Sequence, residues 1–238
     1  MIACHCEVCS SADQHDKRLR SSILVRSANT VFVVDTTPDF RYQMLRTQTD
    51  DLDAVLFTHP HKDHIAGLDD VRAFNFFTKK AMNIYANALT SEAIKHDFYY
   101  AFSDKKYPGV PELNLIMIDT SPFLIGDIPV QPIQVWHHKM PVYGFRFGDF
   151  TYITDANKIE EQEKEKIKGS KVLILNALRK ENHVAHFTLS DAIELAHELE
   201  VPEVYFTHIS HQLGKHEDIN RELPLHIRLA YDGLKICL

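Results

Sequence analysis

The chain has 238 residues, of which 45% are hydrophobic and 25% are charged, and its formal net charge is -7 with the histidines counted as neutral. These values predict a folded protein with a sizeable core, in one domain or in two small ones. The negative charge and the lack of a Lys/Arg run argue against a nucleic-acid partner, because such binding rests largely on neutralising phosphates.

The sequence contains no run of the ~18–20 apolar residues that a membrane span needs, and it shows no basic-then-apolar signal pattern at its start. We therefore expect a cytoplasmic protein. In that reducing compartment, the closely spaced Cys4, Cys6 and Cys9 are expected to bind a metal ion rather than to form a disulfide. Three thiolates would leave one position of a tetrahedral zinc site for a ligand from elsewhere. Cys237, in an apolar C-terminal run, is predicted to be a buried core thiol.

Hydrophobic periodicity and turn residues predict strands interspersed with helices. In the N-terminal half the pattern predicts strands over 22–26, 30–35, 52–57 and 83–86, and helices over 39–46, over 68–77 and from Thr90. In the C-terminal half it predicts strands over 130–135, 144–147, 150–154, 172–175, 203–207, 227–230 and 234–238, and helices over 160–168 and 189–199. Thr188 is a candidate N-cap, and Asp232-Gly233 is typical of a hairpin between the last two strands.

Side chains with metal-binding chemistry recur where a predicted strand ends. Asp35, His137, Asp155 and His208 each close a strand, and the strand over 52–57 runs into Thr58-His59-Pro60-His61-Lys62-Asp63-His64. Imidazoles at alternating positions past a strand can bind one ion, and an Asp-His pair directly after them can face a second ion about 3.5–4 Å away. These imidazole and carboxylate ligands suit zinc, manganese or iron.

The sequence His59-x-His61-x-Asp63-His64 resembles the HxHxDH signature of the metallo-β-lactamase superfamily, and the resemblance extends over nearly the whole chain. It implies an α/β fold, a four-layer αββα sandwich, with a dinuclear metal site along one edge. It also implies the ligands of two divalent ions: His59, His61 and His137 for the first, Asp63, His64 and His208 for the second, and Asp155 as the bridge between them. Asp35 would steady the metal-binding loop without binding a metal itself.

His138 competes with His137 as the third ligand of the first metal. Superfamily members with the same following pattern have a glycine after the ligand histidine, and His138 stands in the place of that glycine. We therefore prefer His137 and keep His138 as the alternative.

Within the superfamily, the chain is most similar to the branch of the phosphoribosyl cyclic phosphate phosphodiesterase, with tRNA 3′-processing endonucleases as more distant relatives. Cys4, Cys6 and Cys9 resemble that branch's structural zinc site, whose fourth ligand would be His211. The histidine at the position of His186 acts near the leaving group in that branch. Such proteins begin with a strand before the cysteines, so we expect one domain over residues 1–238 that lacks its N-terminal strand. A homodimer is also implied.

The resemblance predicts a metal-dependent hydrolase, a phosphodiesterase acting on small or cyclic phosphodiesters through a hydroxide that bridges two zinc or manganese ions. Asp63, Asp155 and His186 would be catalytic. His186, as an imidazolium, would donate a proton to the departing alkoxide, with His183 orienting it, unless His186 is only a structural loop residue. Arg179, like Arg41 and Arg72, could bind a second anionic group or could form structural pairs instead.

Three alternatives to the small-molecule phosphodiesterase stay open at this point. The first is a nuclease that processes RNA 3′ ends, which the acidic charge disfavours. The second is a thioester hydrolase of the glyoxalase II type, which would use the same ligands. The third is a metal-binding or interaction protein whose site does not catalyse.

Overall fold

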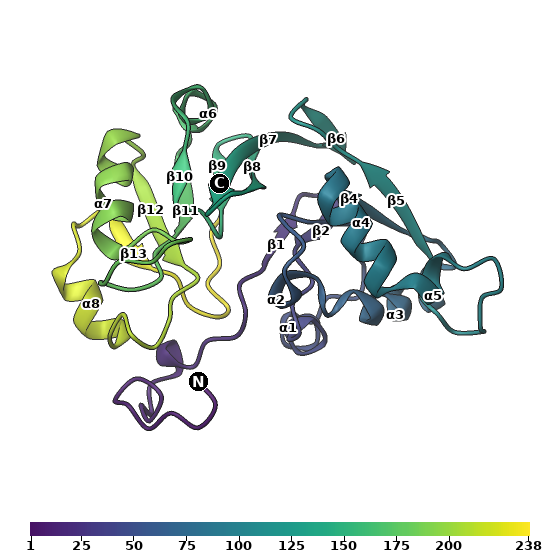
Figure 1. Cartoon of the computed structure of the whole chain (residues 1–238), viewed down its shortest axis with the longest axis horizontal. Helices are drawn as coiled ribbons and strands as arrows, with labels where there is room; N and C mark the ends of the chain where they lie inside the picture. The colour runs from purple at the N-terminus through teal and green to yellow at the C-terminus, as the bar shows by residue number, and fades with distance from the viewer. The chain divides into compact units, whose positions relative to one another are not determined.

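The computed structural model describes residues 1–238, and the chain divides into two compact units. Residues 20–129 form the continuous unit, and residues 1–19 together with 130–238 form the discontinuous unit. Each unit has its own sheet, flanking helices and hydrophobic core (Figure 1). The α/β class predicted from the sequence is therefore confirmed. None of the helices is both long enough and apolar enough to cross a membrane.

The continuous unit is built on a sheet of order β1-β2-β3-β4-β5. Its strands are β1 (Ile23–Arg26), β2 (Val31–Val34), β3 (Ala54–Leu56), β4 (Met82–Ala86) and β5 (Leu113–Met117). The next strand, β6 (Phe123–Ile125), is not part of this sheet and pairs with the strand that follows it. Its helices are α1 (Phe40–Thr47), α2 (Lys62–Ile65), α3 (Arg72–Thr78), α4 (Ala88–Asp97) and α5 (Tyr99–Phe102). β1 and β2 form an antiparallel hairpin, and the other neighbouring pairs are parallel. Parallel strands covered by helices are buried and apolar, as all three residues of β3 are.

The register of β2 and β3 sets up the first group of polar residues. Val34 pairs with Leu56, and the N–H of Asp35 donates to the carbonyl of Leu56 over 2.9 Å. Because parallel strands end at the same edge of a sheet, Asp35 and Thr58 come to lie side by side directly beyond this pair.

The discontinuous unit contains a second sheet, of order β10-β7-β8-β9-β11-β12-β13. Its strands are β7 (Ile128–His137), β8 (Met140–Phe147), β9 (Phe150–Ile153), β10 (Lys158–Ile159), β11 (Val172–Asn176), β12 (Glu203–Thr207) and β13 (Ile227–Leu229). Its helices are α6 (Glu161–Ile167), α7 (Leu189–Glu198) and α8 (His216–Glu222). β7, β8 and β9 are antiparallel, whereas β9, β11, β12 and β13 are parallel.

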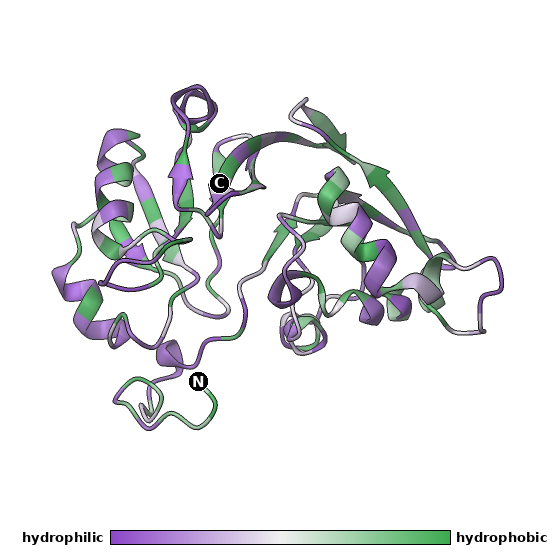
Figure 2. Ribbon diagram, viewed as in Figure 1, coloured by the Kyte–Doolittle hydropathy of each residue, from purple (hydrophilic) through white to green (hydrophobic).

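Helix α7 begins where the sequence predicts it, with a capping box between Thr188 and Asp191. It buries Leu189, Ala192 and Leu195 against the sheet core. Helix α6, by contrast, is mostly hydrophilic (Figure 2), as expected from its run of Glu and Lys residues, and its apolar side chain, Ile167, joins the core.

The N-terminal segment is held on the C-terminal part of the discontinuous unit by hydrogen bonds. Arg18 donates to the carbonyl of Ala230, the N–H of Leu19 donates to Asp232 over 3.0 Å, and the N–H of His216 donates to Asp16 over 2.8 Å. These contacts join residues about 200 positions apart in sequence and hold the cysteine-rich start of the chain in place.

Two predictions for the C-terminus are wrong. Residues 234–238 form no strand, because β13 pairs in parallel with β12 and the chain then turns at Asp232, whose carboxylate binds Leu19 instead of closing a hairpin. Cys237 is exposed and is not a core thiol.

Helix α4 also starts earlier than predicted, because Asn87 caps it by accepting from the N–H of Thr90 over 2.8 Å.

Gly67 has no room for a side chain. Its N–H donates to the carbonyl of Thr36 over 2.8 Å, and a Cβ atom would lie 2.2 Å from the carbonyl oxygen of Thr37 and 2.7 Å from Cβ of Phe40. We therefore expect Gly67→Ala to destabilise the protein by about 1–3 kcal/mol in chemical denaturation. Gly148→Ala is the control, because Gly148 has φ of 61° and no atom within 4 Å of an added Cβ. Its loss of stability should reflect only the cost of positive φ for alanine, without a steric clash. Equal losses for the two variants would contradict the predicted clash.

Candidate metal centre

The loop after β3 carries the HxHxDH motif, and its side chains differ in burial. His59 and His64 are buried, His61 is exposed and Asp63 is half-buried. Helix α2 begins directly after His61 and presents Asp63 and His64 on its first turn. The loop therefore combines two enclosed imidazoles with two more accessible ligands.

Asp35 organises this loop from a fully buried position. Its carboxylate accepts from the N–H of Thr58 over 2.9 Å, from the hydroxyl of Thr58 over 2.8 Å and from Nδ1 of His64 over 2.8 Å. The hydroxyl of Thr58 has its only proton on Asp35, so it must accept from Nδ1 of His59, 2.9 Å away. Both histidines thus carry their proton on Nδ1, which makes Nε2 the electron-pair donor of each ring, the arrangement typical of metal-binding imidazoles.

The separations in the loop also suit metal ions. Nε2 of His59 lies 3.1 Å from Nδ1 of His61. Two imidazole nitrogens bound to one tetrahedral ion would lie about 3.3 Å apart. Nε2 of His64 lies 3.9 Å from a carboxylate oxygen of Asp63, so these two ligands also face each other. The predicted role of Asp35 as a support for the loop agrees with these contacts.

In the discontinuous unit, His137 closes β7 in a buried position. Its Nδ1 donates to the carbonyl of Ala185 over 2.7 Å, which fixes the tautomer in which Nε2 can act as a ligand nitrogen. His138 is exposed, and the structure records only its N–H, which donates to Asn157 over 2.7 Å. This geometry favours His137 over His138 as the ligand.

Asp155 and His208 follow β9 and β12 and face each other. Oδ1 of Asp155 lies 3.1 Å from Nε2 of His208 and accepts from the hydroxyl of Thr154 over 2.9 Å. Both residues have positive φ, 58° for Asp155 and 53° for His208, which is uncommon for residues other than glycine. Strained backbone of this kind is concentrated at functional sites.

Apart from Asp35, sequence reasoning missed the residues that position the candidate ligands. The buried side chain of Asn176 bridges both backbone groups of Ala156, accepting from its N–H over 2.8 Å and donating to its carbonyl over 2.9 Å. The hydroxyl of Thr58 and the carbonyl of Ala185 orient their histidines in the same way. The position of Asn176 at the end of β11 was the available signal, because other site residues also follow strand ends.

His186 lies among the histidines of this unit. Its ring centroid is 4.7 Å from that of His137, 4.8 Å from that of His208 and 4.9 Å from that of His183. Burial lowers the pKa of His186 to about 3 despite the nearby Asp155 carboxylate. The imidazole is therefore neutral at pH 7 in this environment, whereas the sequence argument expected an imidazolium.

Arg179 is engaged within its own unit. Its guanidinium donates to the carbonyls of Glu181 over 3.2 Å and Asn182 over 2.8 Å, and to the side chain of Gln212 over 2.9 Å. These contacts support a structural role for Arg179 rather than the alternative role of binding an anionic group. Arg72 lies 3.6 Å from Asp69 in a similar local pair.

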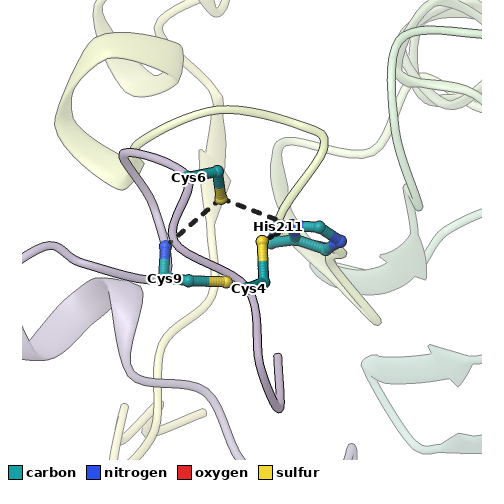
Figure 3. A group of neighbouring side chains, drawn as sticks. All are labelled: Cys4, Cys6, Cys9 and His211. Carbon is teal, nitrogen blue, oxygen red and sulfur yellow. Dashed lines mark hydrogen bonds between the residues drawn. The ribbon is translucent and has the colours of Figure 1, made fainter.

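The four predicted ligands of the structural zinc site come together in the discontinuous unit (Figure 3). The Sγ atoms of Cys4 and Cys6 each lie 3.4 Å from Nδ1 of His211, and the four ligand atoms all lie within 4.8 Å of one another. Ligand atoms of a tetrahedral zinc site lie about 3.5–3.8 Å apart, so this set fits zinc. The N–H of Cys9 and the ring of His211 lower the pKa of Cys6 to about 6, which favours the zinc-binding thiolate.

Comparison with known proteins identifies the family. Residues 30–209 match the model of the beta-lactamase superfamily domain. An octanoyltransferase of Porphyromonas gingivalis is 37% identical over 237 residues, covering 98% of this chain and 48% of that protein. The chain spans about half the length of the curated relatives that it matches.

Among solved structures, a diphosphatase from the PhnP family is 40% identical, with a TM-score of 0.93 over 100% of this chain and 91% of that one. The short form of human tRNase Z is 16% identical with a TM-score of 0.68, covering 90% of this chain and 91% of that one, which shows the fold alone. The predicted metallo-β-lactamase fold is confirmed at the level of the family. That fold implies divalent metal binding, which the His/Asp residues of each unit fit. The chain therefore belongs to the beta-lactamase superfamily and, within it, to the PhnP family.

Proposed function

We propose that the chain is a phosphodiesterase whose site holds two divalent metal ions. The residues that would hold them are His59, His61, Asp63, His64, His137, Asp155 and His208. The observation that carries the proposal is the hydrogen bonding of Nδ1 in His59, His64 and His137. In each of these rings the contact at Nδ1 fixes the tautomer in which Nε2 is the ligand nitrogen, as in metal-binding histidines.

The donor set of imidazoles and carboxylates suits zinc and manganese equally. Two such ions would activate a water molecule and offset the negative charge that develops on the phosphoryl oxygens. The family resemblance assigns Asp155 the role of the ligand shared by the two ions, and its carboxylate is buried and lies 3.1 Å from Nε2 of His208. Asp35 and Thr58 would keep the imidazoles in the correct tautomer throughout the reaction.

His186 would act at the leaving oxygen of the substrate. As a neutral imidazole it donates one N–H hydrogen bond, which stabilises charge developing on that oxygen. The negative charge of a bound phosphate beside it would raise its pKa and favour proton donation. His183, whose ring lies next to that of His186, would orient it.

A small phosphate ester or anhydride is the substrate class we propose. The support is the 40% identity to a protein described as a diphosphatase. The net charge of -7 would repel a long polyanion such as RNA, so we do not propose a nuclease.

Thioester hydrolysis is the second candidate. The relative of 37% identity is named as an octanoyltransferase, and the name denotes chemistry on an acyl group. An acyl thioester would place a carbonyl oxygen, in place of a phosphoryl oxygen, at the same ligand set.

The test is hydrolysis of bis(p-nitrophenyl) phosphate and of octanoyl-coenzyme A by protein loaded with Mn²⁺ or Zn²⁺, with chelator-treated protein as the control. We expect metal-dependent release of p-nitrophenol and no release of free coenzyme A. Thioester cleavage alone would establish the second candidate. Failure to cleave either compound, in protein that contains three bound metal ions per chain (two for the proposed centre and one for the cysteine site), would contradict the proposed catalysis.

A further inference from the structure

We infer that His138 is a recognition residue that donates a hydrogen bond to a second anionic group of the substrate, such as the second phosphoryl group of a diphosphate. The inference rests on the proposed function and goes beyond it, because it concerns the part of the substrate that does not react. It starts from the backbone conformation of His138.

Eight residues other than glycine have positive φ. Three of them, Gln48, Lys79 and Glu200, follow the C-terminal ends of α1, α3 and α7, where a left-handed residue is the usual helix termination. Four others lie at or next to the proposed site: Asp35, His138, Asp155 and His208. The remaining one is Ala3.

The side chains of Asp35, Asp155 and His208 explain why these positions are not glycine. Each contacts another residue of the proposed site, Asp35 through Thr58 and His64, and Asp155 and His208 through each other. The imidazole of His138 is exposed and makes no hydrogen bond or ion pair. Its positive φ is therefore maintained without any stabilising contact of the side chain inside the protein.

Turn geometry makes this choice of residue more unusual. His137 pairs with Met140, so His138 and Lys139 form a two-residue hairpin loop between β7 and β8. Positive φ of 57° at the first loop position, but not at the second, corresponds to a type II′ turn, which favours glycine at the first position. His138 occupies a position that favours glycine, and no contact of its side chain offsets the strain. We therefore infer that the side chain is present for a functional reason.

Hydrogen bonds connect this turn to the loop that carries His186. The N–H of His138 donates to Oδ1 of Asn157 over 2.7 Å, and Nδ2 of Asn157 donates to the carbonyl of Val184 over 3.2 Å. Val184 belongs to the loop that carries His186, and His137 directly precedes the turn. The imidazole of His138 is thus presented on a backbone that is tied to both residues.

The chemistry of the turn is suited to an anion. An imidazole donates an N–H in either protonation state, and the neighbouring Lys139, also exposed, adds a positive charge. A hydrogen bond to a charged acceptor is stronger than one to a neutral acceptor. His138 should therefore raise kcat/KM only for a substrate that has a second anionic group.

The test compares His138→Gly with Glu200→Gly, a variant that removes a left-handed side chain at the end of α7. We expect both variants to raise Tm by about 2–4 °C, because glycine adopts positive φ without strain. For His138→Gly, the ratio of kcat/KM for ADP-ribose, a diphosphate, to that for bis(p-nitrophenyl) phosphate should fall about tenfold. Glu200→Gly should keep this ratio, and both variants should keep the metal content of the parent protein.

An unchanged ratio in His138→Gly would overturn the inference, and so would a parent protein that cleaves bis(p-nitrophenyl) phosphate but not ADP-ribose. A lower Tm for His138→Gly would overturn the strain on which it rests. Cleavage of neither compound by the metal-loaded parent would instead contradict the proposed function. His138→Asn, which tolerates positive φ but has a shorter donor, should give an intermediate ratio.

Discussion

Replacing Asp155 with alanine should lower the turnover of bis(p-nitrophenyl) phosphate by at least about 10²–10³-fold. The buried carboxylate of Asp155 is the only proposed ligand expected to contact both metal ions, and its Oδ1 lies 3.1 Å from Nε2 of His208. The metal content of the variant, measured by elemental analysis, should fall below two ions per chain at the proposed centre. Loss of turnover and loss of metal should appear together, because the same carboxylate serves both.

The matched control for this prediction is Asp155→Asn. Asp155 has φ of 58°, a conformation that costs asparagine less than alanine, so the asparagine variant removes the charge with less backbone strain. Thermal unfolding should therefore be closer to that of the parent protein for Asp155→Asn than for Asp155→Ala, while both lose turnover. A variant that keeps full turnover and both ions would show that Asp155 does not bridge a metal pair.

Replacing Cys6 with alanine should mainly reduce stability. The cysteine site joins the start of the chain to His211, about 200 residues later, and a structural zinc ion contributes its binding free energy directly to folding. We expect the variant to lose one zinc ion per chain and to show a decrease in Tm on the order of 10 °C. Differential scanning calorimetry with zinc analysis of the same sample measures both quantities.

Cys237→Ala is the control for the cysteine site, because Cys237 is exposed and lies outside the cluster. It should retain zinc and the parent Tm. His211→Cys offers a further comparison, since four thiolates also form a tetrahedral zinc site and should keep the ion bound. Unchanged zinc content and Tm in Cys6→Ala would mean that the cluster is not a structural zinc site.

Elements with a strong local pattern could be predicted from the sequence, and weakly patterned ones could not. Buried strands such as β11 and the amphipathic helix α7 have clear periodicity and caps, and they lie where they were predicted. Strand β5 was missed, since it lies at the edge of its sheet and none of its five residues is fully buried. Helix α8 was missed because Ile219 is the only buried residue in its seven, which leaves no periodic signal.

The sequence by itself determined the ligand types and their local order. His59, His61, Asp63 and His64 lie within six positions directly after a buried strand, so spacing alone brings them to one loop. Cys4, Cys6 and Cys9 are close for the same reason. Short-range spacing is readable because a few residues of backbone leave little freedom in where the side chains go.

Tertiary structure alone decided the contacts that depend on distant residues. The loop after β12 brings His211 to the cysteines, and the loop before α7 places the carbonyl of Ala185 at His137, which distinguishes His137 from His138. Burial among three other histidines gives His186 its low pKa, which no local pattern reveals. These features arise from long-range packing, and packing sets burial, tautomer and backbone strain only once the sheets have formed.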